Sequence, residues 1–214
     1  MTTKNQGVAI PSYSICPEGF IHSRSWTALK WTAVLLLTTL AGIQAVSASD
    51  GGTEADWKPS VSSAQWNYIV IHHSATTSGS VESIHENHRR RRDAMGNPWL
   101  GIGYHFVIGN GNGMPDGHIA PTFRWQEQIH GAHSGNAEFN MRGIGICLIG
   151  HFEENQPTAL QLSSAKRLIK TLSIRYNIGG SQIVGHSAVR ATSCPGKLFP
   201  MQEMRESAAR KNHG

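Results

Sequence analysis

The chain has few cysteines and few charged residues for its length of 214 residues. Three cysteines are too few for a small scaffold held together by disulfides, so stability must come from an apolar core. With 39% hydrophobic and only 15% charged residues, the composition suits such a core and excludes a disordered chain. We therefore predict one domain of ordinary size with an additional segment.

A broad cluster of positive charge is also missing. The net charge of +5 falls to +3 without residues 1–48, which carry three of the 19 basic and one of the 14 acidic residues. Arg89–Arg92 are four consecutive arginines, which in a helix would point in different directions around its axis. Because no other Lys/Arg cluster with aromatic residues occurs, we expect no nucleic-acid partner.

No phosphate-binding loop is present. The glycine-rich segment 109–117 (GNGNGMPDG) does not open a helix and contains no Gly-Lys-Ser/Thr. We interpret it as the turn of a β-hairpin between strands near 103–108 and 118–120.

One long apolar run occurs, Trp31–Ala48, which is uncharged and follows Lys30. It ends in Val46-Ser47-Ala48, with small residues where signal peptidase cleaves, and its roughly 15 strongly apolar positions are short for a bilayer span. We predict that residues 1–48 are an export signal, so that the mature chain is periplasmic or extracellular without stable membrane insertion. Because the polar leader is long for a signal, an uncleaved membrane anchor and a mis-assigned start codon stay open.

The remaining chain divides into a Gly-, Ser- and Ala-rich linker at 49–65 and a domain at 66–214. Strands interleaved with helices and one hairpin predict an α/β domain with a central mixed β-sheet flanked by helices on both faces. The least polar segment, 142–150, is predicted to be the central strand. The expected strands are 68–72, 103–108, 118–120, 142–150 and 181–184, and the expected helices are about 80–94, 158–176 and 199–210.

Three residues far apart in the sequence form a candidate zinc site at the ends of strands. His72 ends an apolar strand in IVIHHSAT, while His186 and Cys194 share VGHSAVRATSCPG. Open α/β sheets bind ligands at strand ends, so both imidazoles can project from one edge, and a loop can return the thiolate. Two imidazoles and one thiolate are one ligand fewer than a closed structural site, which leaves a position for water.

The cysteine usage favours this metal site over a disulfide. Cys147 lies inside the apolar run IGICLIG and is interpreted as a small buried hydrophobic residue. A disulfide between Cys147 and Cys194 is the alternative in an oxidising compartment, and it would remove the zinc ligand.

Five segments carry a resemblance to a known family, and they occur in the order IVIHHSAT, GIGYHFVIG, HGAHSG, RGIGICLIG and GHSAVRATSCPG. Over about residues 66–200, the chain resembles zinc-dependent N-acetylmuramoyl-L-alanine amidases of the phage T7 lysozyme and peptidoglycan recognition protein type. The resemblance implies a monomeric peptidoglycan hydrolase that uses Zn²⁺ to cleave the amide between N-acetylmuramic acid and L-alanine. Some receptors of this family lack the cysteine and are inactive. A non-catalytic peptidoglycan-binding recognition protein is therefore the alternative, against which Cys194 argues.

The resemblance also implies roles for individual residues. It places His72, His186 and Cys194 on the family's zinc ligands, and His133 in HGAHSG at the border of the substrate groove. His73 points to the opposite face of the strand from His72, which indicates a structural role or a contact to the ligands.

Tyr104 in GYHF falls on the family's catalytic tyrosine. The phage enzyme has a lysine two residues before the cysteine, where this chain has Thr192, which can donate a hydrogen bond but carries no charge. We hypothesise that Tyr104, together with Thr192, hydrogen-bonds the developing oxyanion. As an alternative, Tyr104 is a core tyrosine with a tethered hydroxyl.

Overall fold

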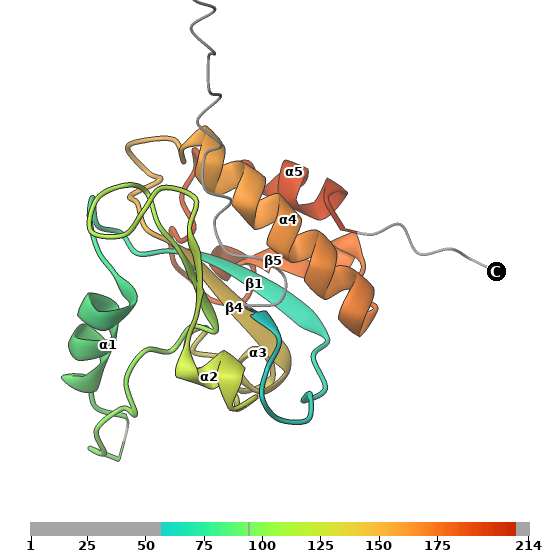
Figure 1. Ribbon diagram of the computed structural model, residues 1–214. Coiled ribbons are helices and arrows are strands. Elements are labelled where there is room, and N and C mark those ends of the chain that lie inside the picture. Colours follow the sequence, from blue (N-terminus) through green and yellow to red (C-terminus); the bar gives the residue numbers. More distant parts are fainter. Residues whose placement is uncertain (1–56, 94, 209–214) are drawn as a thin grey trace, which may run out of the picture. The chain divides into compact units, whose positions relative to one another are not determined.

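The computed structural model describes residues 57–93 and 95–208, in which five strands form one mixed sheet (Figure 1). The strand order is β3-β2-β4-β1-β5, with β4 in the centre, as predicted. β1 pairs in parallel with β4 and β5, β2 pairs in parallel with β4, and β3 returns antiparallel to β2. The strands are β1 (Tyr68–His73), β2 (Phe106–Ile108), β3 (Ile119–Pro121), β4 (Gly143–Leu148) and β5 (Ile183–Gly185).

Helix starts follow the capping residues of the sequence. Ser80 and Thr158 each form a capping box, which satisfies backbone N–H groups at the first turn of their helices. The longest helix ends at Asn177, which adopts a left-handed conformation with φ 53°. The helices are α1 (Val81–Arg89), α2 (Phe123–Gln126), α3 (Ala137–Arg142), α4 (Ala159–Tyr176) and α5 (Met201–Glu206), with 3-10 turns at Gly180–Gln182 and His186–Ala188.

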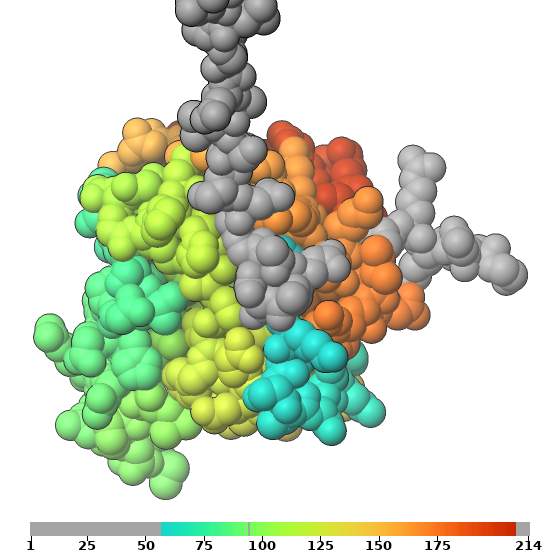
Figure 2. Space-filling view, in the orientation of Figure 1, coloured from blue at the N-terminus to red at the C-terminus, as the bar shows by residue number. Residues whose placement is uncertain are grey.

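The two faces of the sheet pack against different helices, because side chains alternate along each strand. One face carries Ile71 and Ile146, which are fully buried in the main core together with Leu168 of α4. The other face carries Val107, which belongs to a smaller cluster that α1 covers through Ile84. Figure 1 shows α4 and α5 on one side of the sheet and α1 on the other, which confirms the predicted α/β layers. In Figure 2, α1 and the loop after it form a green lobe at one side of the visible face, and α4 lies at the other side.

Several predicted elements are shorter than expected, among them the last helix, which was expected at 199–210 and is observed as Met201–Glu206. The first helix ends at Arg89, not near residue 94, because the chain turns back and Arg92 forms a β-bridge with Pro98. Three of the four arginines therefore lie outside the helix. The strand expected at 103–108 begins only at Phe106. The backbone N–H of Gly103 donates to the side chain of His88 and not to a neighbouring strand.

Short elements were missed by the sequence analysis. α2 and α3 have four and six residues, which is too few for a hydrophobic period to be recognised. The predicted signal or anchor at 1–48 and the first part of the linker lie outside the described residues. Within 57–93 and 95–208, no helix has both the length and the apolar character that crossing a membrane requires.

Candidate metal centre

His72, His186 and Cys194 converge at the ends of β1 and β5. Their ligand atoms all lie within 4.8 Å of one another. Cys194 Sγ is 3.7 Å from His72 Nδ1, and the ring centroids of His72 and His186 are 4.6 Å apart. The tertiary structure thus brings together the three residues that the sequence analysis grouped.

Each imidazole is tied to the protein through one nitrogen. His72 Nε2 lies 3.0 Å from His133 Nδ1, and His133 Nε2 lies 3.2 Å from the carbonyl oxygen of Gly143. His186 Nε2 lies 3.0 Å from the carbonyl oxygen of Ser134. His72 Nδ1 faces Cys194 Sγ, and within the described residues His186 Nδ1 has no hydrogen bond, which suits a metal ion bound between the two imidazoles and the thiolate.

Burial sets the protonation of these groups. It lowers the pKa of His72 well below the ordinary value and, more moderately, lowers the pKa of His186. Burial also raises the pKa of the Cys194 thiol to about 12. Neutral imidazoles are the form that binds metal, and a divalent cation stabilises the thiolate that burial disfavours. The donor set of two nitrogens and one sulfur fits zinc.

The alternative disulfide is wrong. Cys147 and Cys194 are both free thiols. Cys147 is fully buried in β4, opposite His72 in the strand register, where it packs as the predicted small hydrophobic residue. Cys194 is therefore available as a ligand.

Tyr104 lies beside the centre in the segment just before β2, outside the strand that was predicted to contain it. Its ring centroid is 5.0 Å from that of His72. Burial raises the pKa of the Tyr104 hydroxyl well above its ordinary value, and the nearby thiol groups of Cys147 and Cys194 act in the same direction. The hydroxyl therefore stays protonated and can donate a hydrogen bond.

Thr192 is exposed on the loop that leads to Cys194. Its hydroxyl oxygen accepts a hydrogen bond from the backbone N–H of Cys194 at 3.3 Å. Since that bond uses a lone pair of the oxygen, the hydroxyl proton remains available to a further acceptor.

A groove runs past the centre in two adjoining hollows, with volumes of about 260 and 290 Å³, that share His88, Arg91 and Tyr104. Their lining includes the positive side chains of Arg91 and Arg190 and no carboxylate. An anionic ligand is therefore electrostatically favoured. The first hollow is further lined by Ser74, Thr76, Ser78, Ser83, Ile84 and Asn87, and the second by Trp99, Ala132, His133, Gly135, Asn140, His186 and Arg190.

Comparison with known proteins identifies the family. The family model described as N-acetylmuramoyl-L-alanine amidase (Amidase_2) matches residues 62–197, a range that includes every residue of the centre. The chain belongs to this amidase family. It is 33% identical over 177 residues to peptidoglycan-recognition protein SC2 of Drosophila simulans, covering 79% of this chain and 90% of that protein.

Solved structures of amidase-family relatives have the same fold. The amidase LysC from Clostridium intestinale is 34% identical with a TM-score of 0.56, covering 66% of this chain and 84% of that chain. A mutant of Drosophila PGRP-LB, solved in complex with tracheal cytotoxin, is 27% identical with a TM-score of 0.50. That match covers 71% of this chain and 90% of the PGRP-LB chain.

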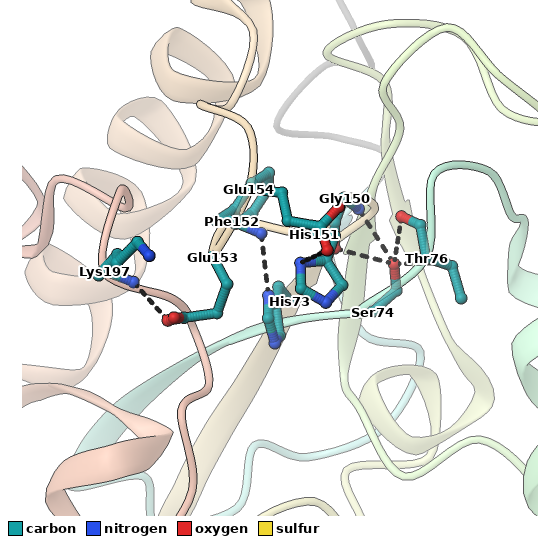
Figure 3. A network of polar contacts seen from close by, with 9 residues as sticks. All are labelled: His73, Ser74, Thr76, Gly150, His151, Phe152, Glu153, Glu154 and Lys197. Carbon is teal, nitrogen blue, oxygen red and sulfur yellow. Dashed lines mark hydrogen bonds and ion pairs between the residues drawn. The ribbon is translucent and has the colours of Figure 1, made fainter.

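In this amidase domain, the loop after β4 connects the segment that carries Cys194 to β1 through hydrogen bonds (Figure 3). The N–H of Phe152 donates to His73 Nδ1 at 3.2 Å, and Glu153 Oε1 accepts from the N–H of Lys197 at 2.7 Å. His73 thus contacts the loop after β4, which agrees with the structural role expected for it. The segment that carries Cys194 is held relative to β1 by these contacts.

His88 is a groove residue of the amidase domain that the sequence analysis left as an ordinary polar residue. Its Nδ1 accepts from the N–H of Gly103 at 3.0 Å, and its ring centroid is 5.5 Å from those of Tyr104 and Trp99. No spacing in the sequence singles it out, because a polar residue in a helix is usually exposed.

Proposed function

We propose that the chain is a zinc-dependent amidase that hydrolyses the bond between N-acetylmuramic acid and the L-alanine of the stem peptide in peptidoglycan. The observation that carries the proposal is the convergence of His72, His186 and Cys194 in a chain of the amidase family. Three protein ligands leave one position open, which is typical of catalytic zinc. Zinc held there supplies Lewis acidity and, by lowering the pKa of a bound water to about 7, a nucleophile at neutral pH.

The residues around the centre stabilise the charge that develops on the carbonyl oxygen. The protonated Tyr104 hydroxyl, next to His72, donates a hydrogen bond to the oxyanion. Thr192 acts as a second donor, because its oxygen accepts from Cys194 while its proton stays free. Hydrogen bonds that form with the oxyanion lower the barrier more than they stabilise the bound substrate.

The groove binds the stem peptide, whose carboxylates match the positive charges of Arg91 and Arg190. His133 also lines the groove, but both of its ring nitrogens are hydrogen bonded within the protein, so it offers substrate only the edge of its ring.

A peptidoglycan-binding protein without turnover is the second candidate, because the 33% identical relative is named a recognition protein. Incubation of purified peptidoglycan with the protein, with and without a chelator, separates the two. We expect mass spectrometry to show stem peptides with a free L-alanine amino group, and the chelator to abolish them. Binding to peptidoglycan without such products would contradict the amidase and favour the recognition protein.

We also propose that the mature chain is a monomer that acts outside the cytoplasm after cleavage following Ala48. Cleavage there gives an N-terminus at Ser49, which sequencing of exported protein detects. An N-terminus at Met1 in the mature protein would favour the membrane anchor.

A further inference from the structure

We propose that the segment His133–Ser134, held by Asn140, is a positioning element that turns the Nδ1 atoms of both His72 and His186 toward one metal ion. The inference rests on the proposed zinc centre and deepens it. None of the three positioning residues is itself a ligand. They act by fixing the tautomer and the orientation of the two imidazoles.

His72 is oriented by the side chain of His133. The carbonyl oxygen of Gly143 can only accept, so His133 Nε2 must donate to it at 3.2 Å. A neutral imidazole with a proton on one nitrogen accepts on the other, so His133 Nδ1 accepts from His72 Nε2 at 3.0 Å. The proton of His72 is thereby on Nε2, and the lone pair is on Nδ1, which lies 3.7 Å from Cys194 Sγ.

The backbone of Ser134 fixes the same tautomer in His186. The carbonyl oxygen of Ser134 lies 3.0 Å from His186 Nε2 and can only accept, so this nitrogen also carries the proton. The lone pair of His186 is again on Nδ1. His133 through its side chain and Ser134 through its backbone therefore fix the same tautomer in both imidazoles.

Asn140 of α3 fixes the segment in space. Its Oδ1 accepts from the backbone N–H groups of His133 and Ser134, each at 2.9 Å. The Ser134 hydroxyl lies 3.0 Å from the same oxygen. One amide oxygen thus anchors the partners of both histidine ligands.

The His133 ring packs closely against two glycines. A Cβ atom placed on Gly131 would lie 2.3 Å from His133 Cδ2, and one placed on Gly145 would lie 2.6 Å from the same atom. A side chain at either glycine would therefore displace the ring from its hydrogen bonds. A partner held by two hydrogen bonds orients the ligand before the metal arrives, which is how groups around metal sites raise affinity.

The test compares two pairs of variants of the mature protein. His133→Phe removes both hydrogen bonds of the ring, whereas His133→Gln keeps an acceptor and a donor. Asn140→Leu removes the anchor, whereas Asn140→Asp keeps an acceptor. Zinc affinity is measured by competition with a chromophoric chelator, and thermal unfolding of the metal-free protein checks that each variant folds.

We expect His133→Phe and Asn140→Leu to bind zinc about 10- to 100-fold more weakly than the wild type, and the two matched variants to stay close to it. If one variant of a pair does not fold, the other pair decides. Unchanged zinc affinity in folded His133→Phe or Asn140→Leu would overturn the inference.

A second readout separates this inference from the proposed function. ¹⁵N NMR of the metal-free wild type reports which ring nitrogen carries the proton, independently of metal and of activity. We expect His72 and His186 to carry it on Nε2. Protons on Nδ1 would overturn the positioning role, whereas a wild type that has this tautomer and binds zinc but does not cleave peptidoglycan would contradict only the proposed function.

Discussion

The backbone N–H of His73 donates to Cys194 Sγ at 3.4 Å. The residue that follows one candidate ligand on β1 therefore holds the sulfur atom of another. This hydrogen bond lowers the pKa of the Cys194 thiol against the larger effect of burial, which raises it. The backbone thus helps to position the thiol, and Cys194 belongs to neither hydrophobic cluster of the sheet.

Substituting Cys194 should separate metal binding from folding. We expect Cys194→Ser to lower zinc affinity by more than about 100-fold, because a thiolate ligand is replaced by a weaker one, while the secondary structure is retained. Metal analysis and circular dichroism measure the two effects. Cys147→Ala is the matched control, since it removes the other buried thiol and should keep the zinc. Unfolding of Cys194→Ser would show that the ion is structural.

Removing the Tyr104 hydroxyl should slow the reaction without loss of metal. We expect Tyr104→Phe to lower kcat by about 10²- to 10³-fold, the usual effect of losing one oxyanion donor. The assay is amide cleavage of a muropeptide at measured zinc content. Turnover equal to that of the wild type would assign Tyr104 to the core, as the alternative interpretation holds.

Thr192 should contribute less than Tyr104, because it is exposed and its hydrogen bonds compete with water. We expect Thr192→Val to lower kcat by about 10-fold, and Thr192→Ser to keep the activity because it retains the hydroxyl. The same cleavage assay compares the two variants. Equal rates for Val and Ser would exclude Thr192 as a donor.

His88 should make the fold sensitive to acid. Burial, followed by the charges of Arg91 and Arg124, lowers the pKa of His88 from 6.5 to about 4 in the folded state. As the pH falls below about 6.5, the unfolded chain takes up the proton and the folded protein does not, so stability decreases until about pH 4. Above pH 6.5 the effect is absent.

The variant His88→Gln isolates this contribution, because glutamine can accept from Gly103 but does not titrate. Urea unfolding of metal-free protein between pH 4 and 7 should show a weaker pH dependence of the free energy of unfolding in this variant, by up to one proton. Identical pH dependence of wild type and variant would mean that His88 titrates normally.

The amino-acid sequence was sufficient for the parts of the structure that depend on local properties. The apolar run at 68–72 predicted β1, and the helix expected at 158–176 is observed as α4, with Thr158 as its cap. Strand ends and ligand chemistry together grouped His72, His186 and Cys194, which the structure places within reach of one ion.

Other features were decided only by tertiary contacts between distant segments. The return of Pro98 against Arg92 ended α1 early, and the position of His88 in the groove depends on its bond with Gly103. The roles of His133 and Asn140 arise because α3 and β4 pack beside the ligands. The type of a residue and the periodicity of its segment can be seen in the sequence. The ring nitrogen that a histidine presents to a metal is set by the group that the fold places against its other ring nitrogen.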